Sequence, residues 1–169
     1  MLVAGAGGWL LWQWNAGREY DAGVSAYERG AREVARTSFA RFAQDHADDA
    51  RPLVYLGRIA REDRDLARAR RFLEAAVRLD PSNAAAQREL AAALLADGQP
   101  ELARRFYVRA IELNPADRLS QGFLACALHR LGRFDEAKRW ADRAGPGEWI
   151  PCLSAPVLLA PPAPAIPPP

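Results

Sequence analysis

The sequence has few of the residues from which metal centres and disulfide frameworks are built. Its 169 residues include two histidines and two cysteines, with no CxxC motif, so we expect neither a metal site nor a cofactor. Cys126 falls within an apolar helical stretch, which predicts a buried structural thiol, and a bridge to Cys152 is left open. Lys138 is the single lysine, so any basic surface consists of arginine, whose planar fork suits carboxylates.

The sequence also lacks an excess of positive or negative charge. The net charge is +2, and 26% of the residues are charged against 50% that are hydrophobic. This balance is typical of a folded domain with a core and does not indicate a nucleic-acid partner. The run REDRDLARARR at 61–71 alternates in sign, which favours solvated helix surface.

Residues 1–15 form an apolar segment that contains Trp9, Trp12 and Trp14. The segment is shorter than the roughly 20 residues of a membrane-spanning helix, and it lacks the basic start of a signal peptide. Two interpretations stay open: the remnant of a membrane anchor whose start lies upstream of Met1, or a segment buried against another protein.

A repeat organises the middle of the chain. The stretch AVRLDPSNA at 76–84 recurs as AIELNPADR at 110–118, with the prolines 34 residues apart. Small residues recur with the same period where two helices would approach closely, and proline stops the second helix. These packing positions are Gly57, Ala69, Ala76, Pro81, Ala91, Ala103, Ala110, Pro115, Ala125, Ala137 and Ala144.

This pattern resembles the tetratricopeptide repeat (TPR) family over about residues 16–149. The resemblance implies an all-α fold, a right-handed solenoid of antiparallel helix hairpins with a concave surface. We expect four repeats at about 16–49, 50–83, 84–117 and 118–149. Their helix pairs are expected at about 17–29 and 31–44, 51–63 and 66–79, 84–97 and 100–113, and 118–131 and 134–145.

The chain changes character after Gly145. Trp149 and Ile150 are expected to cover the open face of the last helix. Residues 150–169 form a Pro-rich tail, which favours an extended conformation. The tail is either flexible or, because it is apolar, docked on its own groove or on another copy.

No catalytic constellation emerges from the sequence. His46 lies in a polar loop near Asp48 and Asp49, where an inter-repeat turn is expected rather than a metal site. Cys126 and His129 share a helical side, but no third group orients them as a nucleophile and base. We therefore predict that the chain is not an enzyme.

The resemblance implies that a partner lies against the first helix of each repeat. Carried over by position, the candidate groove residues are Tyr20, Tyr27, Arg51, Arg58, Glu62, Arg88, Cys126, His129 and Arg130. Arginine, tyrosine and small apolar residues suit an extended protein segment with acidic and hydrophobic side chains. The lysine and asparagine pattern with which chaperone-binding TPRs hold a C-terminal carboxylate is missing.

These features predict a non-catalytic protein-interaction scaffold, bacterial in its composition, and tethered to a membrane or larger assembly by its N-terminus. The cell envelope is favoured over the free cytoplasm. Two alternatives stay open: a self-associating subunit of a homopolymer in which both end segments pack on neighbouring copies, and an assembly factor of a membrane complex.

Overall fold

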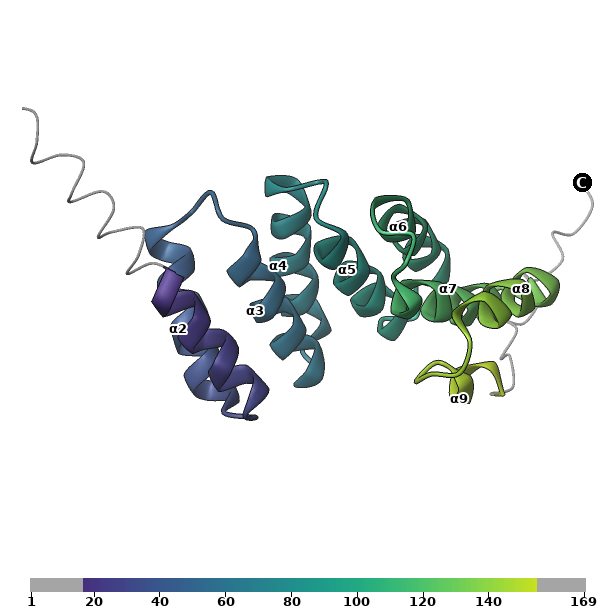
Figure 1. The fold of residues 1–169 in the computed structure, drawn as a ribbon, viewed down its shortest axis with the longest axis horizontal. Helices are drawn as coiled ribbons and strands as arrows, with labels where there is room; N and C mark the ends of the chain where they lie inside the picture. Colours follow the sequence, from purple (N-terminus) through teal and green to yellow (C-terminus); the bar gives the residue numbers. More distant parts are fainter. Residues whose placement is uncertain (1–16, 155–169) are drawn as a thin grey trace, which may run out of the picture.

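The computed structural model describes residues 17–154, and every regular element in that range is a helix (Figure 1). A helix at 17–28 precedes α2 (Arg32–Asp45), α3 (Arg51–Glu62), α4 (Leu66–Leu79), α5 (Ala84–Ala96), α6 (Pro100–Leu113), α7 (Arg118–Arg130), α8 (Phe134–Ala144) and α9 (Ile150–Leu153). Successive helices pack as antiparallel hairpins that stack along the long axis of the molecule (Figure 1). The prediction of an all-α solenoid is confirmed. The expected N-terminal segment with Trp9, Trp12 and Trp14, and the tail beyond Ser154, lie outside the described residues.

Small residues face large ones inside each hairpin. Gly57 on α3 lies against the side chain of Leu73 on α4, and Gly23 in the first helix lies against Phe39 on α2. Leu73 and Phe39 are fully buried, so a Cβ at either glycine would meet a side chain that cannot move aside. The absence of a side chain at these positions lets the two helices approach closely.

The other packing positions lie where helices cross. Their alanines are 0–3% exposed: Ala69, Ala76, Ala91, Ala103, Ala110, Ala125, Ala137 and Ala144. Pro81 and Pro115 are exposed and lie just after the ends of α4 and α6. Proline cannot donate a backbone hydrogen bond, which is why each helix ends before it.

The turn inside each hairpin needs a residue in the left-handed region. Gly30, Gly98 and Gly132 take φ values of 77°, 74° and 74°. Arg64 occupies the corresponding place between α3 and α4 with φ 65°, although it has a side chain. A left-handed conformation costs an L-residue about 1–2 kcal/mol. The second hairpin therefore carries a turn penalty that the other three avoid.

Turns between hairpins supply caps to the next helix. The side chain of Asn83 accepts a hydrogen bond from the backbone N–H of Ala86 at the start of α5. Asp117 accepts from the N–H groups of Leu119 and Ser120 at the start of α7. Such caps satisfy backbone donors that have no partner within the helix.

The chain turns back after α8. Gly145, at φ 71°, ends α8, and the short helix α9 packs on α7. Trp149 is 3% exposed and lies on α7 at Gly122, in one core cluster with Ala137 and Ala144 of α8. The expectation of a covering residue thus holds for Trp149, which is buried against the last hairpin, and is wrong for Ile150, which is 49% exposed.

Cys126 and Cys152 form a disulfide, with Cα atoms 5.8 Å apart. The expectation of a buried Cys126 is confirmed at 1% exposure, and the bridge to Cys152 that the sequence left open is formed in place of the favoured free thiol. The return of α9 onto α7 brings the two cysteines together across 26 residues of sequence. Within residues 17–154, no helix is long and apolar enough to cross a membrane.

We expect Arg64→Gly to stabilise the protein by about 0.5–1 kcal/mol, because glycine adopts the left-handed turn without steric cost. The reciprocal change Gly98→Arg should destabilise it by about 1–2 kcal/mol, because open space surrounds Gly98 and only the backbone conformation resists a side chain. Urea unfolding followed by circular dichroism measures both. Equal stability of Arg64→Gly and the wild type would contradict the turn penalty.

Candidate functional site

The first helix of each hairpin lines one continuous face, which we call the groove. Its predicted residues fall on the helix at 17–28 (Tyr20 and Tyr27), on or at the ends of α3 (Arg51, Arg58 and Glu62), on α5 (Arg88) and on α7 (Cys126, His129 and Arg130). The structure links most of them to one another or to neighbours that the sequence analysis did not select.

Tyrosines and arginines alternate at the N-terminal end of the groove. Arg51 lies 4.6 Å from the ring centre of Tyr20, and Arg58 lies 5.7 Å and 5.3 Å from those of Tyr27 and Tyr55. We call Tyr20, Tyr27 and Tyr55 the aromatic patch. A cation over an aromatic ring is attracted by the ring's negative face. The patch therefore holds its arginines in place.

Burial and hydrogen bonds raise the pKa values of two tyrosine hydroxyls in this patch. The hydroxyl of Tyr27 donates to the carboxylate of Glu62, the last residue of α3. Burial, reinforced by this bond, raises the pKa of Tyr27 to about 12. Burial and the proximity of Tyr55 raise the pKa of Tyr20 to about 12 as well. Both tyrosines therefore stay neutral donors at physiological pH.

Glu89 on α5 is the centre of the charged part of the groove. It is 6% exposed, and its carboxylate lies 2.8 Å from Arg58, 3.3 Å from Arg61 and 3.7 Å from Arg88. Burial by itself would lower the pKa of Arg58, but the attraction of Glu89 outweighs it and raises that pKa. One buried carboxylate thus holds three guanidinium groups, and the cluster keeps a net positive charge.

Asp117 extends this network from α5 to α7. Its Oδ2 accepts from Arg88 at 2.8 Å and from the hydroxyl of Ser120 at 2.8 Å. Burial alone would raise the pKa of Asp117, yet the hydrogen bonds from Ser120 and Arg88 lower it. Asp117 stays ionised and joins consecutive hairpins.

A pocket of about 320 Å³ opens next to this network, and we call it the arginine pocket. Its charged lining consists of Arg61, Arg88, Glu89, Arg130 and Glu148. Its uncharged lining includes Ala92, Leu95, Tyr107, Leu119 and Phe123. The pocket therefore combines positive charge with an apolar wall.

Two polar atoms at this pocket have no hydrogen-bond partner in the described part of the chain. They are the buried Nε of Arg61 and the hydroxyl of Tyr107. Tyr107 is fully buried, and burial raises the pKa of its hydroxyl. An unsatisfied buried donor costs about 1–3 kcal/mol, so a ligand oxygen that accepted from either group would relieve that cost.

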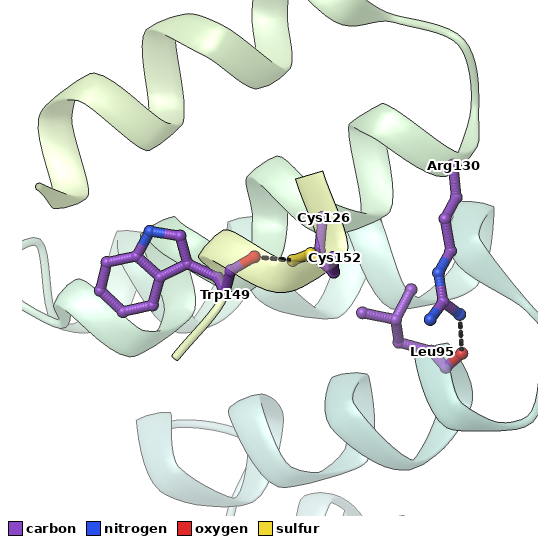
Figure 2. Close-up of a disulfide and its surroundings, with 5 residues drawn as sticks. All are labelled: Leu95, Cys126, Arg130, Trp149 and Cys152. Atoms are coloured by element: carbon purple, nitrogen blue, oxygen red, sulfur yellow. Dashed lines mark hydrogen bonds between the residues drawn. A yellow bond between two sulfur atoms is a disulfide. The ribbon is translucent and has the colours of Figure 1, made fainter. Parts of the chain in front are cut away.

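The three predicted residues of α7 each contact another part of the protein. Arg130 donates from Nη1 to the backbone carbonyl of Leu95 at 2.7 Å, which ties α7 to the end of α5 (Figure 2). The ring of His129 packs against Phe134, with centroids 5.2 Å apart. Cys126 is buried in the disulfide, so its side chain is not on the open surface and it is no free nucleophile.

The sequence analysis missed Arg61, Glu89 and Phe123. The interpretation of 61–71 as solvated surface is wrong for Arg61, which lines the pocket and contacts Glu89. A signal existed for Glu89, because it is a lone carboxylate within the apolar run of α5. Nothing in its position alone indicated which arginines would reach it.

The described residues contain no cluster of three or more side chains suited to hold a metal ion. His46 instead stacks on Phe42, with ring centroids 4.1 Å apart. The site's chemistry is that of recognition by charge, hydrogen bonds and apolar contact.

Stacked helix hairpins with a groove along their first helices define a helical-repeat protein built for binding. Sequence profiles described as tetratricopeptide repeat match residues 20–84 and 60–125, which together span most of the array. The chain belongs to the tetratricopeptide repeat family, as its 34-residue period predicted. No curated protein matches the sequence significantly.

Several solved structures share the fold. An O-GlcNAc transferase from Thermobaculum terrenum is 27% identical with a TM-score of 0.69, over 76% of this chain and 26% of the transferase. This chain thus spans about a quarter of that protein. MamA from Desulfovibrio magneticus RS-1 is 20% identical with a TM-score of 0.67, over 76% of this chain and 73% of MamA.

A third structure is the first TPR domain of Spaghetti (RPAP3), bound to the HSP90 peptide SRMEEVD. It is 20% identical with a TM-score of 0.66, over 69% of this chain and 93% of the domain. Family and fold together support a protein-interaction scaffold, since TPR domains bind peptide partners.

We expect Glu89→Gln to destabilise the protein by about 3 kcal/mol, because it leaves Arg58 and Arg61 without their buried counter-charge, whereas Arg88 keeps Asp117. Guanidinium unfolding measures the change. Glu101→Gln is the matched control: Glu101 pairs with Arg104 at the surface, where an ion pair contributes little. An equally small effect at both positions would contradict the central role of Glu89.

Acid should weaken the link between α5 and α7. Because the pKa of Asp117 is lowered in the folded state, its stabilisation is complete above the unfolded value of about 4 and is lost as pH falls through the folded value. Asp117→Asn should therefore lose stability at pH 7 and show a smaller further loss between pH 5 and pH 2 than the wild type. Unfolding at each pH, with the exposed Asp142→Asn as control, tests this.

Proposed function

We propose that this chain is a non-catalytic scaffold that binds an extended protein segment with acidic and hydrophobic side chains in its groove. The observation that carries the proposal is the cluster of three partly exposed arginines around the buried Glu89 at the edge of the arginine pocket. Glu89 and Asp117, which pairs with Arg88, together carry one charge fewer than the three arginines, so the pocket attracts a further anionic group.

The pocket's geometry supports the same ligand class. Arginine offers paired donors that match a carboxylate, and a partly desolvated site strengthens such bonds. Leu95, Leu119 and Phe123 supply the apolar contact expected beside the charge. Leu119 is 39% exposed, which leaves apolar surface for a partner to cover. An acidic side chain flanked by an aliphatic or aromatic one fits both parts.

The groove's polar groups support binding rather than catalysis. Arg58, Arg88 and Asp117 hold consecutive helices together through their ion pairs. General acid–base or nucleophilic chemistry needs a titratable group poised beside a reacting atom. The similar transferase is an enzyme, but this chain corresponds to a quarter of it, so the likeness carries no activity to this chain.

The disulfide favours an oxidising compartment, because cytoplasmic reductants keep most thiols reduced. We therefore propose that the scaffold works outside the reducing cytoplasm, which agrees with the cell-envelope localisation expected from the sequence. Tethering through the apolar residues 1–15 stays a prediction.

The proposal is tested with a positional-scanning library of fluorescein-labelled decapeptides on the full chain. We expect selection of aspartate or glutamate beside an aliphatic or aromatic residue. The double variant Arg61→Ala with Arg88→Ala should weaken the selected peptides about 10- to 100-fold, because each charge-assisted hydrogen bond is worth about 1.5–3 kcal/mol. Fluorescence polarisation measures this affinity.

The matched control is Arg68→Ala with Arg109→Ala, which removes the same charge from α4 and α6. Circular dichroism confirms that each variant is folded at the assay temperature. An equal loss of affinity in both double variants would show that the peptide responds to the net charge of the protein and not to the arginine pocket, which would contradict the proposal. Selection of basic peptides would refute the proposed ligand class.

A further inference from the structure

The segment after α8 occupies the groove at its C-terminal end. Glu148 lines the arginine pocket, Trp149 lies on the face of α7 at Gly122, and Cys152 is bonded to Cys126 of the same helix (Figure 2). In Figure 1 α6 lies above α7 and α9 lies below it, so the segment approaches α7 from the side opposite to α6. The chain thus covers part of its own binding face.

The slot for Trp149 is built from the helix backbone. A Cβ on Gly122 would collide with the indole ring, so glycine is required for the ring to lie on α7. Phe123 meets the ring edge-on, with centroids 6.3 Å apart and planes at 75°. The carbonyl oxygen of Trp149 lies 3.4 Å from Sγ of Cys126 (Figure 2). We call Gly122, Phe123 and Cys126 the tryptophan slot.

Beyond Trp149, the segment packs on the core of the described residues only through the partly buried Cys152 and Leu153. None of the residues of α9 is buried, and Ile150 is 49% exposed. The indole N–H is buried without an acceptor among the described residues, which weakens the docking of the ring. Arg118 bonds the carbonyls of Ala144 and Pro146, which lie before the segment. The disulfide is the one covalent link that returns residues 148–153 to α7.

We propose that residues 148–153 are an intramolecular ligand of the groove, retained by the Cys126–Cys152 disulfide and released when a dithiol reduces it. The vacated slot and the arginine pocket then accept a partner segment in which an acidic residue precedes a tryptophan or phenylalanine. The chain's own Glu148-Trp149 pair is the template, because it presents an acid at the pocket and an aromatic ring in the slot. This deepens the proposed function of the groove and rests on it.

The redox step is a thiol–disulfide exchange. A thiolate of the dithiol attacks the sulfur of Cys152, which is partly exposed, and Cys126 leaves as a thiolate that takes up a proton. The second thiol of the reductant then displaces Cys152 from the mixed disulfide. The protein gains two electrons and two protons, and the dithiol becomes a cyclic disulfide.

Release is measured by alkylation of Cys126, which needs no partner. In Cys152→Ser the single remaining thiol is Cys126, which lies 1% exposed beneath the docked segment. We expect iodoacetamide to modify Cys126 in Cys152→Ser at a rate within about threefold of that in the double variant Trp149→Ala with Cys152→Ser. The double variant also lacks the indole ring that docks the segment. A rate at least tenfold slower than in the double variant would show that the segment stays docked without the disulfide, and would overturn the redox control.

Occupation of the vacated slot is tested with a fluorescein-labelled peptide GPGEWIPSLS, which copies residues 145–154 with serine for Cys152. It should bind the full chain carrying Trp149→Ala and Cys152→Ser, and bind the oxidised wild type at least tenfold more weakly. Wild type reduced with dithiothreitol should bind it within about threefold of the double variant, because its own segment stays tethered and competes only weakly once the disulfide is broken.

Two controls define the ligand class. The same peptide with alanine for tryptophan should not bind, and adding Gly122→Ala to the double variant should abolish binding by filling the slot. Equal binding of the oxidised wild type and the double variant, or indifference to both controls, would overturn the assignment of the slot. Neither result depends on the decapeptide selection at Arg61 and Arg88, so failure of this inference is distinguishable from failure of the proposed function.

Discussion

The close approach of two helices at a small residue underlies the rest of this structure. Gly23 against Phe39 and Gly57 against Leu73 bring the helices of the first two hairpins together. A single hairpin buries only one of its faces, so each must stack on the next. That stacking sets the first helices side by side, and the groove is the surface they share.

The charges of the groove, which we propose as the binding surface, also hold this stack together. Arg58 on α3 bonds Glu89 on α5, and Arg88 on α5 bonds Asp117 at the start of α7. Each pair joins consecutive hairpins along the binding face. Because these groups are largely buried, removing one charged side chain leaves its partner buried without a counter-charge, which destabilises the protein. The side chains that we propose for binding therefore also take part in repeat packing.

Much of the fold was predictable because its determinants are local and periodic. Proline and glycine end helices through their own backbone properties, and a 34-residue period places the same residue types at each crossing. Arg64 shows the limit of local signals: it takes the place of the turn glycine with φ 65°, and the period alone predicted the second hairpin there. The helices of the groove lie where the period predicted them, but the sequence did not indicate which side chains pair between them.

The sequence by itself determined the helices, their period and the family, since helix ends depend on nearby residues and the same residue types recur every 34 residues. The tertiary structure decided which arginines surround Glu89, that Cys126 is bonded to Cys152, and that Trp149 lies on α7. Apart from that between the neighbours Arg88 and Glu89, these contacts join residues 23 to 31 positions apart, and their formation depends on the angle at which hairpins stack and on the reversal of the chain at Gly145. Such angles result from the packing of many side chains at once, and no local pattern encodes them.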